Sequence, residues 1–196
     1  MKLAFLASNN GSGMRAIVGA IEAGELAAEA RLVISNRPQS PALAFARDHG
    51  VEARFIPTVA DPDGADARLV AVLGDSGAEW VILSGYLRKL GPRALAAYRG
   101  RILNIHPALL PKFGGQGMYG RRVHEAVLAA AETHTGASVH IVDGDYDHGP
   151  VIAQAKVAVA AGDDADAIER KVTAVEPGLL VDTLRRIAEG SLVRPR

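Results

Sequence analysis

Short apolar runs and helical spacing alternate along the first hundred residues. Apolar runs that are typical of strands occupy residues 3–7, 30–35, 51–56, 80–83 and 101–105. Between them, apolar residues recur at helical spacing, which predicts helices over residues 14–23, 41–49, 65–73 and 92–98. Strands and helices that alternate roughly every 20–30 residues are typical of a doubly wound parallel sheet. We therefore expect an α/β protein with a mostly parallel sheet.

The pattern changes after residue 107. A glycine-rich loop at 113–120 precedes a predicted helix over residues 123–131. Two further predicted strands, 137–142 and 150–159, are joined by so short a connection that they form an antiparallel hairpin. The end, 163–190, has a helical pattern that we expect to be interrupted or kinked at Pro177. With no linker in the sequence, we expect one domain, 1–196, made of an N-terminal part (1–100) and a C-terminal part (101–196).

Composition narrows the possible partners. Lys and Arg together number 22, as do Asp and Glu, so no net charge favours nucleic acid or an anionic membrane. The chain has no cysteine, which excludes disulfides, thiolate metal sites and cysteine nucleophiles. Neither a signal peptide nor an apolar run of membrane-spanning length is present. We expect a soluble, cytoplasmic protein with small-molecule partners, and neither nucleic acid nor a membrane among them.

The most informative segment is Leu103-Asn104-Ile105-His106-Pro107. In a strand, Asn104 and His106 lie on the same face, roughly 6.6 Å apart. The pair combines a neutral amide donor with a side chain that titrates near neutral pH. Pro107 ends the strand, so the pair lies at its carboxyl end, where open α/β sheets bind ligands. The alternative is a strand end whose two polar residues meet solvent.

A second candidate site is the turn Gly11-Ser12-Gly13, between the first strand and the first helix. Backbone N–H groups and the positive end of a helix suit a phosphate. The turn is not a Walker A loop, because Met14 stands where that motif needs lysine, and it lacks the third glycine of the dinucleotide fingerprint. It is either a phosphate monoester site or a tight turn with a serine cap.

The segment Asp143–Asp147 resembles the start of a calcium loop. His148 at the sixth position and Gln154 at the twelfth exclude that interpretation. The segment is either a solvated turn or a corner from which Asp147 points inward to the sheet edge. No histidine pair has the spacing of a zinc site, so we expect no metal, and we expect His140 to be a satisfied core histidine.

In order and spacing, several motifs match one family. The chain resembles glycinamide ribonucleotide formyltransferases, folate-dependent enzymes of purine synthesis, over essentially its full length. The matching stretches are Asn10-Gly11-Ser12, Ser84-Gly85-Tyr86-Leu87-Arg88, Leu103–Pro111, Ser138-Val139-His140, Asp147-His148-Gly149-Pro150-Val151-Ile152 and Gln154-Ala155. The resemblance implies a Rossmann-like formyltransferase fold in which residues 1–100 bind phosphate and residues 101–196 are catalytic and bind folate.

The resemblance also implies roles for individual residues. The catalytic residues would be Asn104, His106 and Asp147, which stabilise a tetrahedral oxyanion and orient the imidazole. Proton movement would use His106 or a water held by Asp147. The substrate phosphate would lie on Gly11, Ser12 and Gly13, and the ribose hydroxyls on Glu176. The pterin of the co-substrate, 10-formyltetrahydrofolate, would lie along Leu87, Arg88, Leu90 and the loop Asp143–Asp147.

Several positions depart from the family pattern. Gly13 stands where Asn is usual, and Pro177 follows Glu176 where His is common. An insertion, 114–120, lengthens the loop beside the site and is either a lid or a surface loop. Arg68 would replace the arginine that holds the folate tail, and Arg121 and Arg122 would either close over an anion or be solvated.

The expected reaction is formyl transfer to phosphoribosylglycinamide by a monomer or homodimer, without metal. One alternative is formyl transfer to another phosphorylated amine, such as an amino sugar. A second is hydrolysis of formyltetrahydrofolate, and a third is a non-catalytic module that binds a nucleotide or folate.

Overall fold

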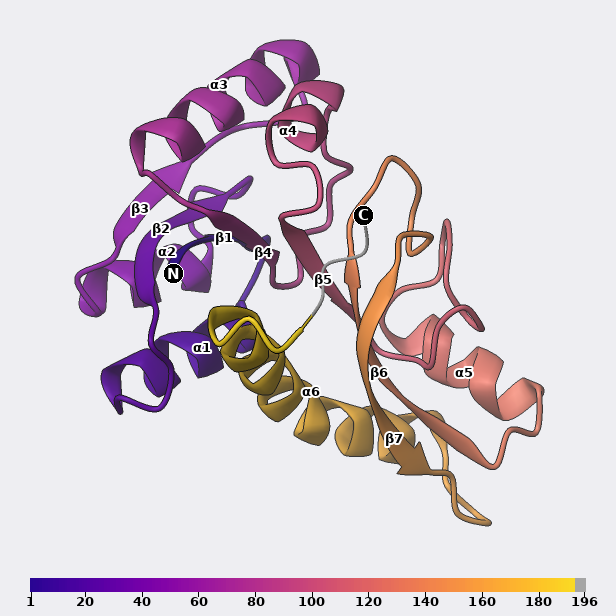
Figure 1. Cartoon of the computed structure of the whole chain (residues 1–196). Coiled ribbons are helices and arrows are strands. Elements are labelled where there is room, and N and C mark those ends of the chain that lie inside the picture. The colour runs from indigo at the N-terminus through magenta and orange to yellow at the C-terminus, as the bar shows by residue number, and fades with distance from the viewer. Residues whose placement is uncertain (193–196) are drawn as a thin grey trace. The chain divides into compact units, whose positions relative to one another are not determined.

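Every helix and strand expected from the sequence is present in the computed structural model, which describes residues 1–192 (Figure 1). The strands are β1 (Lys2–Leu6), β2 (Glu29–Ser35), β3 (Glu52–Phe55), β4 (Trp80–Leu83), β5 (Ile102–His106), β6 (His134–Ile141) and β7 (Val151–Ala158). The helices are α1 (Ser12–Glu22), α2 (Pro41–Asp48), α3 (Pro62–Asp75), α4 (Pro92–Ala97), α5 (Arg121–Ala129) and α6 (Ala165–Ala188).

The strands follow the order β3-β2-β1-β4-β5-β6-β7 in one sheet. The pairs β1–β2, β1–β4 and β2–β3 are parallel, whereas β6 and β7 pair antiparallel. The mostly parallel, doubly wound sheet with a C-terminal hairpin is therefore confirmed. The chain divides into two compact units, Met1–Leu103 and the residues from Asn104 onward, so that the division falls within β5.

In the first unit, the strand order creates a ligand-binding edge. The chain passes from β1 outward to β2 and β3, and then returns to place β4 on the other side of β1. Ligands of open α/β sheets bind at the carboxyl ends of the strands where the order reverses in this way. Two candidate segments lie there, because Gly11–Gly13 follows β1 and Leu87–Leu90 follows β4. Helices α3 and α4 lie side by side on the opposite face of this unit from α1 (Figure 1).

In the second unit, the hairpin β6–β7 packs against α6, and α6 packs against α5. Its core consists of Val127 from α5, Ala137 from β6, and Ile168 and Val172 from α6. Strand β7 approaches β6 closely at Gly136, where an added β-carbon would lie 1.9 Å from the carbonyl oxygen of Ala155. This core supports the loop after β5, since Phe113 packs against it.

Of the two outcomes expected at Pro177, an interruption of the last helix is wrong, because α6 is one helix from Ala165 to Ala188, whereas a kink stays a prediction. Apolar residues on both sides of the proline, Ile168 and Val172 before it and Leu180 and Leu184 after it, are fully buried. A proline removes one backbone hydrogen bond, and burial of one continuous apolar face offsets that loss. Within residues 1–192, no helix has the length and apolar character needed to span a membrane.

Candidate active site

A cluster of four polar side chains lies within the second unit. The Nδ1 atom of His106 is 3.3 Å from Oδ2 of Asp147. His140 joins the other two members, because its Nε2 is 3.0 Å from Nδ2 of Asn104 and 3.5 Å from Oδ1 of Asp147. The structure thus brings Asn104, His106 and Asp147 together, with His140 between the amide and the carboxylate.

Local backbone geometry positions each member of this cluster. Strand β5 ends at His106, two residues after Asn104. The pairing of β6 with β7 shifts register between Val139 and His140, and such irregularities re-aim side chains next to active sites. The turn before β7 is tight at Gly149, where an added β-carbon would lie 1.9 Å from the carbonyl oxygen of Ile141. Asp147 has a left-handed backbone, with φ of 55°.

His106 lies between two hydrogen-bond acceptors. Its Nε2 donates to the carbonyl oxygen of Phe113 at 2.7 Å, and its Nδ1 faces the Asp147 carboxylate. Only the charged imidazolium can donate to both acceptors. Burial is nevertheless the largest effect and lowers the pKa of His106, although the charge of Asp147 and the Phe113 carbonyl act in the opposite direction. Asp147 therefore favours the charged form of His106, but burial outweighs its effect.

Asp147 is held as a carboxylate. Burial alone would raise its pKa, but the hydrogen bond with His140, the charge of His106 and the hydrogen bond from Gly115 together lower it. The N–H of Gly115 donates to Oδ2 of Asp147 at 3.1 Å. The cluster therefore combines an ionised acid with a histidine that is neutral near pH 7, which is the arrangement of an acid–base pair.

The loop after β5 packs tightly on Asp147. An added β-carbon at Gly114 would lie 2.5 Å from Cδ2 of Leu110 and 3.0 Å from Cβ of Asp147. Phe113, whose carbonyl binds His106, has φ of 57°, which is left-handed like the backbone of Asp147. Strained backbone of this kind concentrates at functional sites, where the surrounding packing holds it in place.

Ser138 fixes the segment between His106 and this loop. Its hydroxyl donates to the carbonyl oxygen of Ala108 at 2.6 Å and accepts from the N–H of Leu110 at 2.9 Å. It also accepts from Nε2 of Gln154 at 2.8 Å. Because one donor and both acceptor positions are used, the hydroxyl ties the segment after β5 to β6 and β7.

The Gly11–Gly13 turn, in the first unit, offers free backbone donors. Gly11 is left-handed, with φ of 65°, and precedes α1, which begins at Ser12 rather than at Met14 as expected. The N–H of Met14 donates to Oγ of Ser84 at 2.9 Å, and the serine cap weighed from the sequence is absent. Among the described residues, none accepts from the N–H groups of Ser12 and Gly13, so they are available to an anion.

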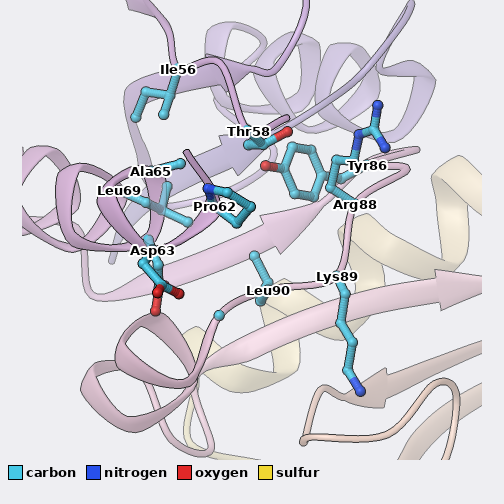
Figure 2. Close-up of a pocket in the computed structure, with 12 residues that line it drawn as sticks. Ile56, Thr58, Pro62, Asp63, Ala65, Leu69, Tyr86, Arg88, Lys89 and Leu90 are labelled. Atoms are coloured by element: carbon cyan, nitrogen blue, oxygen red, sulfur yellow. The ribbon is translucent and has the colours of Figure 1, made fainter. Parts of the chain in front are cut away.

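A cavity of about 160 Å³ lies in the first unit beside the segment after β4. Thr58, Tyr86 and Arg88 gather at one end of it and Asp63 lies at the other (Figure 2). Burial raises the pKa of Tyr86 to about 12, with a smaller opposing effect of Arg88, so its hydroxyl stays neutral. Of the residues expected to hold the pterin, Arg88 and Leu90 line this cavity, whereas Leu87 is not among the lining residues and is 52% exposed.

The sequence model of the formyl transferase family matches residues 1–184. The chain belongs to the formyl transferase family. It is 36% identical to the chloroplastic phosphoribosylglycinamide formyltransferase of Arabidopsis thaliana, over 96% of this chain and 65% of that protein. It is 34% identical to the Escherichia coli phosphoribosylglycinamide formyltransferase, over 98% of this chain and 89% of that protein. The chain thus spans just under two thirds of the plant relative.

A solved structure gives the same result for the fold. The glycinamide ribonucleotide transformylase 1 of Symbiobacterium toebii superposes with a TM-score of 0.89 and 33% identity, covering 98% of this chain and 90% of that one. The Rossmann-like formyltransferase fold expected from the sequence is therefore confirmed.

Glu176 of this formyl transferase is half-buried on α6. Burial, with a smaller effect of the neighbouring Glu169 carboxylate, raises the pKa of Glu176 to about 7. With this pKa, the Glu176 side chain is a charged hydrogen-bond acceptor above pH 7 and is largely protonated below pH 7.

The other charged residues singled out from the sequence have partners of their own. Arg68 forms an ion pair with Asp61 at 3.2 Å. Arg121 pairs with Glu125 at 2.9 Å and also with Asp166, and the guanidinium of Arg122 lies 5.5 Å from the centre of the Tyr119 ring.

Asp143, the remaining residue expected at the folate site, lies in the turn before β7. It accepts from the N–H of Asp145 at 3.0 Å. In the part of the chain that the structure describes, no group of three or more His, Asp or Glu side chains is arranged to hold a metal ion.

Sequence reasoning missed two members of the formyl transferase site. His140 is buried and satisfied, as expected of a core histidine, because its Nδ1 contacts the carbonyl oxygen of Ile141 at 3.2 Å. Its contacts with Asn104 and Asp147 were not foreseen. The Phe113 carbonyl was also missed, because a backbone group carries no residue-type signal. The polar position of His140 within the matching Ser138-Val139-His140 stretch was the available sign.

Proposed function

We propose that this formyl transferase moves the formyl group of 10-formyltetrahydrofolate to the primary amine of phosphoribosylglycinamide. The observation that carries the proposal is the buried contact of Asp147 with His106 beside Asn104. An amide donor, an imidazole and a carboxylate are the groups that acyl transfer to an amine requires. The names of the relatives supply the acceptor, and the resemblance to folate-dependent formyltransferases supplies the formyl donor.

In the proposed reaction, the amine nitrogen attacks the formyl carbon, and a new C–N bond forms while the carbonyl oxygen becomes an oxyanion. The second N–H of the Asn104 amide stabilises this oxyanion, because the first contacts His140. The amine loses a proton, N10 of the folate gains one, and the bond between N10 and the formyl carbon breaks.

Two routes carry the proton in this proposal. In the first, neutral His106 accepts it from the amine, and the nearby Asp147 carboxylate stabilises the resulting imidazolium. In the second, a water held by Asp147 accepts it, and the positive charge of protonated His106 stabilises the oxyanion. The lowered pKa of His106 supports the first route, since it makes the neutral ring the resting form.

Binding roles are proposed for residues outside the cluster. The free N–H groups at Ser12 and Gly13, together with Gly11, would hold the phosphate. Glu176 would accept the ribose hydroxyls. For the folate, Arg88 and Leu90 offer a cation and an apolar wall to the cavity beside them. Leu87 and Asp143 are proposed to bind the folate as well.

We propose that no metal takes part. The amide of Asn104 and the imidazole of His106 can supply the charge stabilisation that a metal would otherwise provide. Activity should therefore be unchanged after dialysis against a chelator, and a loss that added divalent cation restores would contradict this part of the proposal.

One assay separates the possible reactions. The protein is given 10-formyltetrahydrofolate with phosphoribosylglycinamide, with a phosphorylated amino sugar, or with water alone, and release of tetrahydrofolate is followed. The proposal predicts rapid release only with phosphoribosylglycinamide. Release with the amino sugar but not with phosphoribosylglycinamide would show that the acceptor is an amino sugar. Release without any amine would indicate a hydrolase. No release under any condition would indicate a binding module.

A further inference from the structure

Arg15, on the first turn of α1, contacts backbone carbonyl groups at the candidate phosphate-binding turn. Its Nε donates to the carbonyl oxygen of Asn10 at 2.9 Å, and one terminal nitrogen donates to the carbonyl oxygen of Pro41 at 3.2 Å. Its backbone N–H donates to the carbonyl oxygen of Gly11 at 2.9 Å. Arg15 therefore binds two consecutive carbonyl groups of the turn.

These two contacts set the direction of two N–H groups. The C=O and N–H of a planar trans peptide point in opposite directions. Arg15, by holding the Asn10 carbonyl, makes the N–H of Gly11 point away from the guanidinium. The N–H of Ser12 is directed by the first hydrogen bond of α1, from the backbone of residue 15 to the Gly11 carbonyl, which does not depend on the arginine side chain. Both N–H groups belong to the turn that would receive the phosphate.

A column of side chains holds the Arg15 guanidinium in place. The guanidinium lies 4.4 Å from the centre of the Phe45 ring, on α2. Phe45 stacks on His49, with ring centres 3.9 Å apart. His49 in turn contacts Glu22, with 2.7 Å between Nδ1 and Oε1. The column begins and ends on α1, so it fixes the arginine between two helices of the same unit.

Side chains of the Gly11–Gly13 turn itself do little to set the direction of its peptide groups. Gly13 has no side chain, and Ser12 makes no capping hydrogen bond. Gly11 fits closely, because an added β-carbon would lie 3.2–3.4 Å from Met14, Ala7 and Ala42. The position of the turn is thus fixed by packing, whereas the direction of the peptide between Asn10 and Gly11 depends on the Arg15 side chain.

We propose that Arg15 is a positioning residue for the substrate phosphate: its guanidinium orients the N–H of Gly11 by holding the carbonyl of Asn10. The inference rests on the proposed function, since it assumes that the turn receives the phosphate of the acceptor. The guanidinium is needed for this role, because it donates to the carbonyls of Asn10 and Pro41 at once while it lies over the Phe45 ring.

The test compares Arg15→Lys, Arg15→Gln and Phe45→Leu with the unchanged protein. KM and kcat are measured with phosphoribosylglycinamide and with the same acceptor lacking its phosphate, and the inhibition constant of inorganic phosphate is determined. Misdirecting hydrogen bonds to a charged group should raise KM for the phosphorylated acceptor about tenfold in both Arg15 variants. Phe45→Leu should give a smaller rise, and kcat and the folate KM should stay unchanged.

Arg54→Gln is the matched control, because Arg54 is an exposed arginine of the same unit that pairs with Glu52 on β3. Thermal unfolding confirms that each variant is folded. A KM for Arg15→Lys equal to that of the unchanged protein would overturn the inference, because charge alone would then suffice. If the unchanged protein itself does not distinguish the two acceptors, the proposed phosphate site fails instead.

Discussion

The carboxylate of Asp147 lies 3.3 Å from Nδ1 of His106, and both side chains are almost completely enclosed by protein. Burial lowers the pKa of His106 while the negative charge of Asp147 partly opposes that shift. His106 is therefore a neutral base at neutral pH, and the neighbouring Asp147 carboxylate stabilises its charged form. This relationship leads to the predictions below.

The catalytic efficiency of the unchanged protein should fall in acid at a pH below the ordinary histidine range, because His106 must be neutral to accept a proton. In Asp147→Asn, the charge that favours imidazolium is lost, so the pKa of His106 should fall further. Titration of His106 by NMR in both proteins measures this directly. A rise in the His106 pKa in Asp147→Asn would show that the two side chains are not coupled as the structure indicates.

Glu176 should make acceptor binding depend on pH. Its pKa is raised to about 7, so the carboxylate that would accept ribose hydroxyls is increasingly protonated as the pH falls below 7. KM for phosphoribosylglycinamide should therefore rise on the acid side of pH 7, and Glu176→Gln should remove that dependence. Because Glu169 contributes to the raised pKa, Glu169→Gln should move the rise in KM to lower pH. An unshifted profile in Glu169→Gln would assign the dependence to another group.

Gly114→Ala should impair turnover through a steric effect. The added β-carbon would lie 2.5 Å from Cδ2 of Leu110 and 3.0 Å from Cβ of Asp147, so the loop and the carboxylate must move apart. A displacement of this size at a catalytic group lowers kcat by about 100-fold. Gly144→Ala is the matched control, because nothing lies within 4 Å of its added β-carbon. Equal kcat values for the two variants would mean that the loop does not position Asp147.

Replacing His140 should slow the reaction without weakening substrate binding. In His140→Phe, Asn104 loses its acceptor, and the pKa of Asp147 should rise because a neighbour that lowers it is removed. We expect kcat to fall by about 10- to 100-fold. His134→Phe, an exposed position on the same strand, is the control. A kcat for His140→Phe equal to that of the unchanged protein would show that His140 contributes only to packing.

Part of the site could be predicted because it is local in sequence. Alternation along β5 and the following Pro107 place Asn104 and His106 together without reference to the rest of the fold. His140 is different: its contact with Asn104 joins two strands and depends on a register shift between Val139 and His140. Hydrophobic periodicity does not reveal a shift of one residue, so the pattern along β6 does not predict the contact of His140 with Asn104.

The last helix shows the same division between local and tertiary effects. Pro177 is locally unfavourable for a helix, and the sequence analysis weighted that effect. The structure shows that the apolar residues on both sides of Pro177 are buried on one continuous helix, and tertiary packing overrides the local preference.

The central claim, that the carboxylate beside His106 takes part in the chemistry, is tested most directly by the turnover number of Asp147→Asn. Folate affinity and thermal unfolding are measured in parallel to show that the site and the fold persist. The account predicts that kcat falls by about 10²–10⁴-fold while folate affinity stays the same. A kcat close to that of the unchanged protein would contradict it.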